Sequence, residues 1–148
     1  MDQPTAGTML RALDRFVGEW AMAAGPPGGP PWPGAARVRF EWLPGGVFLH
    51  QRWTVDHPDA PDGAAIIGCD AANGTYTQLY ADEREVCRVY AMRLDGDVWT
   101  LRRRGTPFAQ RFTGRFSADG ATITGRWELA REGGAWETDF EVTYTRVA

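Results

Sequence analysis

The chain has 148 residues, enough for one domain with a substantial core. Its net charge of −3 argues against a dedicated nucleic-acid binder, and its 43% hydrophobic and 24% charged residues are ordinary for a soluble globular protein. No apolar run approaches the roughly 20 residues of a membrane span, and the first residues lack the basic start and apolar run of a secretory signal. We therefore expect one cytoplasmic domain over residues 1–148, with no membrane or nucleic-acid partner.

The basic residues and the cysteines exclude several kinds of site. All 16 basic residues are arginine, so no lysine is available for Schiff-base chemistry or a phosphate-binding loop. Cys69 and Cys87 cannot form a tetrahedral zinc site alone, and the two histidines are poorly spaced to complete one. We expect small buried thiols, with a disulfide as the alternative.

The only helical pattern lies near the N-terminus, over residues 8–16. Its apolar positions share one face of a helix: Met9, Leu10, Leu13, Phe16 and Val17. Thr8 is the expected N-cap and Gly18 the expected stop. We expect this short helix to pack against one end of the body that follows.

The rest of the chain consists of short alternating segments separated by turn signals such as Asp95-Gly96 and Asp119-Gly120. The expected strands, about ten, are residues 18–24, 37–42, 47–55, 64–70, 75–81, 86–94, 98–103, 108–117, 121–130 and 136–147. Such a meander predicts an all-β fold, a single antiparallel up-and-down barrel closed on itself, with a two-sheet sandwich as the alternative.

A proline-rich loop, residues 25–34, interrupts the early strands with five prolines and four glycines. Proline lacks the N–H that a sheet interior needs, so this segment is expected to be a flap or a semi-rigid loop. Trp32 lies within it and is expected to act as a lid over the barrel mouth or as a structural peg.

Alternation sorts most strands into an inner and an outer face. In the last strand the aromatic set that begins with Trp136 and includes Phe140 and Tyr144 is expected to point inward. Gly114 and Gly125 fall among large inward residues, where a closing barrel needs bends or room. Residues 47–55 are ambiguous, because either the face with Gln51 or the face with His50 could be internal.

An arginine expected inside the barrel indicates a ligand cavity in place of a solid core. Arg88 alternates with Tyr90 on an inward face, and a solid core tolerates arginine only with partners. A ligand cavity, by contrast, uses a few polar groups to orient its guest. The candidate ligand-binding residues are Arg88, Tyr76, Tyr80, Gln110, Trp127, Arg52, Arg103 and Trp32. His50 and Tyr90 are the candidate catalytic residues, as acid–base groups.

Several pieces of the sequence resemble known barrels. Gly18-Glu19-Trp20, after a short helix, resembles the Gly-x-Trp motif of lipocalins and nitrobindin-like ten-stranded barrels, which are of the calycin type, and Arg146 resembles the arginine that packs over that tryptophan. Further pieces are similar to a bacterial barrel family of unknown function: LPGGVFLHQRW, IIGCD, the Asp119-Gly120 hairpin, ITGRWE and WETDFEVTYTR. The resemblance covers most of the chain and implies the barrel, with Trp20 and Arg146 as structural residues.

The same resemblance bears on cofactors. Nitrobindin-like proteins bind haem through a histidine late in the chain, and this sequence has no histidine after His57. Haem could then be bound only from a different strand, through His50. The sequence otherwise contains no nucleophile, dinucleotide or phosphate-loop motif.

We expect a barrel that binds a small, largely apolar or aromatic molecule in an aromatic cavity, without a cofactor. A cofactor-independent isomerase or cyclase that uses the same cavity is the alternative, and haem binding is a third hypothesis. The sequence is compatible with either a monomer or a homodimer.

Overall fold

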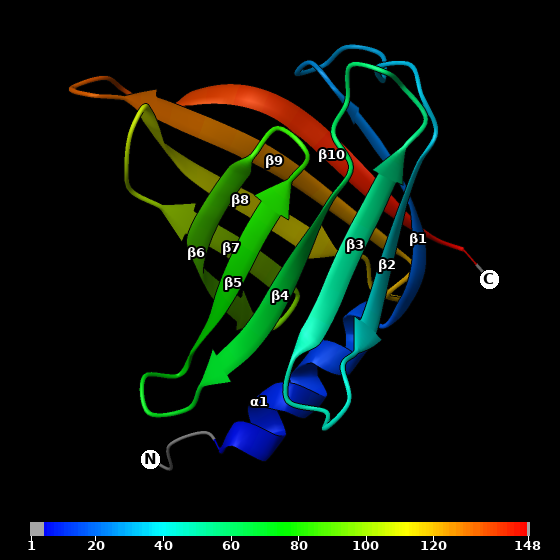
Figure 1. Cartoon of the computed structure of the whole chain (residues 1–148), viewed down its shortest axis with the longest axis vertical. Coiled ribbons are helices and arrows are strands. Elements are labelled where there is room, and N and C mark those ends of the chain that lie inside the picture. The colour runs from blue at the N-terminus through cyan, green and yellow to red at the C-terminus, as the bar shows by residue number, and fades with distance from the viewer. Residues whose placement is uncertain (1–4, 148) are drawn as a thin grey trace.

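Each strand pairs antiparallel with the next one in sequence, and β1 (Gly18–Gly25) closes the ring by pairing with β10 (Glu137–Val147), as Figure 1 shows. This computed structural model describes residues 5–147. The other strands lie close to their predicted positions: β2 (Ala36–Trp42), β3 (Leu49–Val55), β4 (Gly63–Asp70), β5 (Thr75–Asp82), β6 (Val86–Asp95), β7 (Val98–Arg103), β8 (Phe108–Phe116) and β9 (Thr122–Arg131). The predicted closed ten-stranded barrel is confirmed, and the sandwich is not formed.

The predicted helix is present and covers one end of the barrel (Figure 1). It consists of α1 (Ala6–Ala12) and a 3₁₀ turn, η1 (Leu13–Phe16). Thr8 is not its N-cap, because the helix starts earlier and the Thr5 hydroxyl accepts the Thr8 backbone N–H at 3.1 Å. Within residues 5–147, no helix is both long and apolar enough to cross a membrane.

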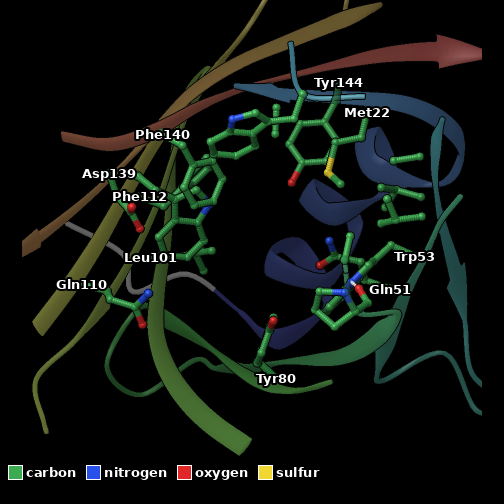
Figure 2. A pocket seen from close by; sticks show the side chains of 18 of the residues that line it. Met22, Gln51, Trp53, Tyr80, Leu101, Gln110, Phe112, Asp139, Phe140 and Tyr144 are labelled. Atoms are coloured by element: carbon green, nitrogen blue, oxygen red, sulfur yellow. Dashed lines mark hydrogen bonds between the residues drawn. The ribbon is translucent and has the colours of Figure 1, made fainter. Parts of the chain in front are cut away.

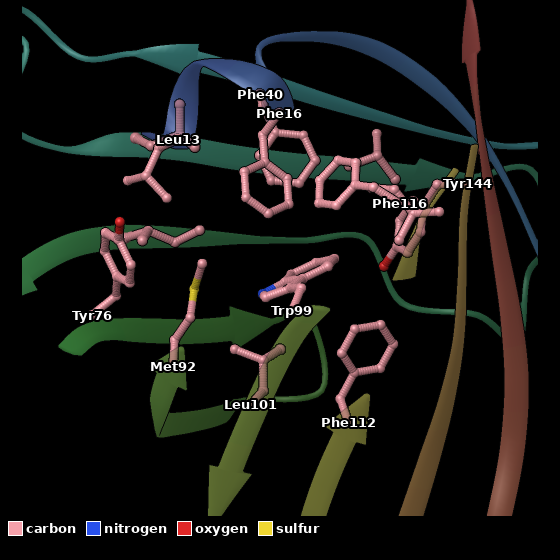
Figure 3. Packing of buried hydrophobic residues seen from close by; sticks show 14 of the residues in the cluster. Leu13, Phe16, Phe40, Tyr76, Met92, Trp99, Leu101, Phe112, Phe116 and Tyr144 are labelled. Atoms are coloured by element: carbon pink, nitrogen blue, oxygen red, sulfur yellow. The ribbon is translucent and has the colours of Figure 1, made fainter. Parts of the chain in front are cut away.

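The helix fills its end of the barrel with a solid aromatic core (Figure 3). Phe16 is fully buried, and its ring centroid lies 5.1, 4.9 and 5.1 Å from those of Phe40, Trp99 and Phe116. The contacts with Trp99 and Phe116 are edge-to-face, and such contacts add to the free energy gained by burial. This end of the barrel is therefore closed by packed side chains.

The contact expected between Arg146 and Trp20 is also present. The guanidinium carbon of Arg146 lies 4.2 Å from the centroid of the Trp20 ring, and its two Nη atoms donate to the carbonyls of Val17 and Arg15 at 2.8 and 2.6 Å. Trp20 is buried and donates to the carbonyl of Phe16 at 2.8 Å. The last strand thus holds the end of the helical segment in place.

Pairing settles which face of β3 points inward. Leu49 and Gln51 are buried, and Trp53 follows them on the same face. His50 and Arg52 consequently lie on the outer face of the barrel. Val47 and Phe48, expected to open this strand, lie instead in the connection of residues 43–48.

The inward assignment of Trp136 is wrong. Trp136 precedes β10, is 40% exposed, and lies beneath the guanidinium of Arg111 at 4.3 Å. The pairing of β10 with β9 shifts register between Thr138 and Phe140, so simple alternation does not extend through this point.

Glycines make room for a large ring, as the sequence suggested. A Cβ on Gly125 would lie 2.5 Å from the Phe112 ring, and one on Gly114 would lie 2.8 Å from it. The Phe112 ring therefore lies over both glycines and is itself buried.

The two cysteines are not fully buried, contrary to the expectation of buried thiols. Cys69 is half-buried and Cys87 is exposed on the outer face of β6, and both are free within the described chain. Cys87 falls on the outer face because it alternates with the inward Arg88.

Candidate ligand cavity

The half of the barrel beyond the aromatic core encloses a cavity of about 510 Å³. It reaches from the core to the loops at the end opposite α1, where residues 32–34 and 59–61 border it. This volume lies within the range of about 300–1,000 Å³ that small-molecule sites occupy. Its aromatic lining residues are Trp32, Trp53, Tyr80, Tyr90, Trp99, Phe108, Phe112, Trp127, Phe140 and Tyr144.

Trp127 is the centre of the aromatic wall. Its ring centroid lies 5.1 Å from that of Phe112, 5.6 Å from Tyr90 in an edge-to-face arrangement, and 6.3 Å from Phe140 in a stacked arrangement. These rings pack against one another, and their contacts stabilise the wall in the absence of a ligand.

A second aromatic pair faces the cavity from β3 and β5. Trp53 stacks on Tyr80 with ring centroids 5.2 Å apart, and its indole nitrogen donates to the carbonyl of Pro61 at 3.3 Å. A Cβ on Gly63 would clash with the Trp53 ring, so glycine at this position allows the ring to lie across the strand. The loop around Pro61 and the cavity wall are thereby joined.

Arg88, Gln110 and Tyr90 form a polar cluster on the wall. The Gln110 side-chain oxygen accepts from the Tyr90 hydroxyl at 2.8 Å and from Arg88 Nη1 at 3.1 Å. Arginine only donates, so its contact fixes the Gln110 oxygen toward Arg88 and leaves the amide nitrogen free to donate elsewhere. Burial raises the pKa of the Tyr90 phenol, which keeps it protonated near neutral pH.

Two further polar points face the same space. Gln78 donates to the side-chain oxygen of Gln51 at 3.2 Å, and both are buried. Burial raises the pKa of Tyr144, whose hydroxyl has no hydrogen-bond partner within residues 5–147. In Figure 2, Gln51 and Gln110 lie on opposite walls and the Tyr144 hydroxyl projects toward the open centre.

The proline-rich loop borders the mouth of the cavity. Trp32 is 52% exposed, and its ring packs against Phe140 with a centroid distance of 5.7 Å. The loop is held by two hydrogen bonds, from the Trp32 N–H to the Ala24 carbonyl at 2.7 Å and from the Gly28 N–H to the Glu141 carboxylate at 2.8 Å. Trp32 thus lies at the entrance, anchored on one side.

Charged groups gather at the rim. The Tyr80 hydroxyl donates to Asp82 at 2.5 Å, and the guanidinium of Arg84 donates to the same carboxylate at 2.7 Å. The bond from Arg84 is the largest cause that lowers the Asp82 pKa to about 2. Asp139 is exposed as a residue, but partial desolvation of its carboxyl raises its pKa.

Six of the ten predicted site residues meet in this cavity: Arg88, Tyr80, Gln110, Trp127, Trp32 and Tyr90. The other four do not line it. His50 and Arg52 are on the outer face of β3, because the buried residues of that strand are Leu49 and Gln51. Of the two faces that the sequence leaves open for residues 47–55, these two side chains lie on the outer one.

Tyr76 and Arg103 are the remaining two, and each is already bound to backbone. The Tyr76 hydroxyl donates to the carbonyl of Met9 in the helix at 2.7 Å. Arg103 donates to the carbonyls of Phe108 and Thr106, both at 3.0 Å, and so holds the connection between β7 and β8. Both side chains are thus held by backbone carbonyls, and neither residue belongs to the cavity lining.

Sequence reasoning missed several lining residues, chiefly Gln51, Gln78, Trp53 and Tyr144. The signal for Gln78 was present, because it alternates with two tyrosines. Gln51 and Trp53 could be assigned only after the inner face of β3 was known.

The histidine ligation of haem that the resemblance implies does not fit this cavity. His50 lies on the outer face, and His57 lies in the loop after β3, where its Nδ1 accepts the Asp59 N–H at 3.1 Å. Neither histidine belongs to the cavity wall.

Comparison with known proteins supports the fold alone. No protein-family model matches the chain, and no curated protein does. Among solved structures, Rv2717c from M. tuberculosis is similar, with a TM-score of 0.69 and 18% identity over 99% of this chain and 100% of that one. A protein of unknown function of the DUF3598 family from Nostoc punctiforme PCC 73102 aligns over 99% of this chain and all of its own, at 8% identity and a TM-score of only 0.28. The first similarity bears out the ten-stranded antiparallel barrel.

Proposed function

We propose that this barrel binds one small, largely apolar or aromatic molecule in its cavity. The observation that carries the proposal is the contrast between the two ends of the barrel. The end under α1 is packed solid, whereas about 510 Å³ stays open behind a wall of aromatic rings. Protein interiors are normally close-packed, so an open volume of this size is best explained by an occupant.

The lining favours a flat, apolar guest. Trp127, Tyr90 and Phe140 offer ring edges and faces within one wall, and aromatic guests prefer such offset or edge-to-face contacts. Gln51, Gln78 and the Tyr144 hydroxyl supply a few polar points that would set its orientation. Trp32 at the mouth would contact a bound molecule from the solvent side.

An isomerase or cyclase in the same cavity loses one of its two candidate groups, because His50 lies outside. Tyr90 stays available as a proton donor, since its phenol is protonated near neutral pH. No feature of the cavity favours turnover over binding, and binding is the function that we propose.

Isothermal titration calorimetry with 2-naphthol tests the proposal, and two neighbouring alanines of β1 provide matched variants. Ala24 lines the cavity and Ala23 is exposed on the outer face. We expect one site per chain with a negative heat-capacity change, the mark of apolar burial. Ala24→Trp should weaken binding because its side chain would occupy part of the cavity, and Ala23→Trp should preserve it.

Two results would contradict the proposal. One is the absence of binding by 2-naphthol and by other two-ring aromatics of similar size. The other is equal binding by the two tryptophan variants, which would place the ligand on the outer surface. Circular dichroism of both variants checks that each one folds.

A further inference from the structure

We infer that the ligand is an aromatic acid whose carboxylate binds Arg88 and Gln110. This inference rests on the proposed function and narrows it to one chemical class. It follows from the charge, the hydrogen bonds and the rings that surround Arg88.

Arg88 is a half-buried cation in the cavity wall without an acidic partner. Within residues 5–147 it forms no ion pair, and its hydrogen bond goes to the neutral side chain of Gln110 at 3.1 Å. A cation that is partly shielded from water is stabilised by an opposite charge placed beside it, and a bound carboxylate would supply that charge. Arg84 shows the contrast, because it lies at the rim and is paired with Asp82 at 2.7 Å.

Several hydrogen-bond donors of the Arg88–Gln110–Tyr90 cluster have no acceptor within the described chain. The Gln110 oxygen already accepts two bonds, from Arg88 and from the Tyr90 hydroxyl. The Gln110 amide nitrogen and the Nε and Nη2 of Arg88 have no acceptor within the described chain. A carboxylate is an acceptor-only group with two oxygens, and arginine binds it in a planar, two-bonded geometry.

The aromatic rings next to Arg88 and Gln110 favour an aromatic group in the remainder of the ligand. The Phe108 ring centroid lies 5.6 Å from the guanidinium carbon of Arg88, and Tyr90 meets Trp127 edge to face at 5.6 Å. A carboxylate on Arg88 would therefore carry a ring into contact with Trp127. The acids of the cavity lining, Asp59 and Asp139, are exposed as residues, and neither forms an ion pair with Arg88 within residues 5–147.

The test compares 2-naphthoate with 2-naphthamide, which share a ring system and a shape and differ in charge. At pH 7 the wild-type protein should bind naphthoate about tenfold more tightly, since hydrogen bonds to a charged group are worth more than neutral ones. Arg88→Met should remove this preference, because the charge-assisted bonds to the naphthoate carboxylate are lost. Gln110→Glu should do the same, because its new carboxylate would pair with Arg88 and repel the ligand anion.

The outcomes separate the inference from the proposed function. Equal affinity of the wild-type protein for the two compounds, or a preference that persists in Arg88→Met, overturns the inference and leaves the binding barrel standing. Failure of both compounds to bind overturns the proposed function as well. The wild-type comparison decides even where a variant fails to fold.

Discussion

The Phe112 ring lies over Gly125 with no space for a side chain between them, and this contact predicts the effect of one added methyl group. In Gly125→Ala the new Cβ would lie 2.5 Å from two ring carbons of Phe112 and 3.3 Å from the carbonyl oxygen of Thr113. The ring cannot move freely, because its centroid is 4.9 Å from that of Trp99 and 5.1 Å from that of Trp127. Overpacking of this kind typically costs about 1–3 kcal/mol.

Urea unfolding followed by tryptophan fluorescence measures this cost. A loss of about 2 kcal/mol lowers the urea midpoint by about 1 M, given a slope of about 2 kcal/mol per molar urea. The Phe112 ring also lines the cavity, so its displacement should weaken the binding of 2-naphthol in the same variant.

Two controls isolate the cause. Gly7→Ala adds a methyl group in α1, where the nearest atom is Arg11 Nη1 at 3.4 Å, and it should leave stability unchanged or raise it by up to about 1 kcal/mol. In a Phe112→Leu background, Gly125→Ala should cost less than about 0.5 kcal/mol, because the clashing ring is gone. A Gly125→Ala protein as stable as the wild type would refute the reasoning.

Three further changes test other parts of the structure. Arg146→Leu removes two charge-assisted hydrogen bonds to backbone carbonyls and should lower the free energy of unfolding by about 2–3 kcal/mol. Calorimetry should then show a Tm lower by about 5–10 °C. An unchanged Tm would contradict the role given to this arginine. Tyr76→Phe removes the buried hydrogen bond to the Met9 carbonyl and should lower the free energy of unfolding in urea by about 1–2 kcal/mol. The affinity for 2-naphthol should stay the same. Weaker binding would show that Tyr76 contributes to the ligand site. Asp82 has a folded-state pKa of about 2, lowered chiefly by the bond from Arg84, so its carboxylate stabilises the fold above about pH 4 and this contribution is lost as the pH falls toward about 2. The Tm of Asp82→Asn should therefore depend less on pH between about 4 and 2, and an equally steep dependence would show that another group controls acid unfolding.

The barrel was predictable because its strands are defined locally. Alternation and the turns at Gly96 and Gly120, both with positive φ, give the strands and their antiparallel connections, and closure follows from the need to cover edges. Arg88 and Gln110 could be placed inside for the same reason, since each alternates with large inward rings.

The errors arose where position depends on distant parts of the chain. Both faces of residues 47–55 carry apolar and polar side chains, so only pairing with β2 and β4 shows that His50 points outward. The register shift beside Asp139 displaces Trp136 without a sequence signal. Tyr76 and Arg103 alternate correctly, but carbonyl groups brought close by folding already occupy their polar ends.

The central claim is that the open half of the barrel holds an aromatic guest. A crystal of the protein soaked with 6-bromo-2-naphthol, measured by anomalous diffraction at the bromine edge, tests it most directly. We predict one bromine peak per chain inside the barrel, close to the rings of Trp127 and Tyr90. Bromine found only on the outer surface, or an interior filled by the protein's own side chains, would contradict the account.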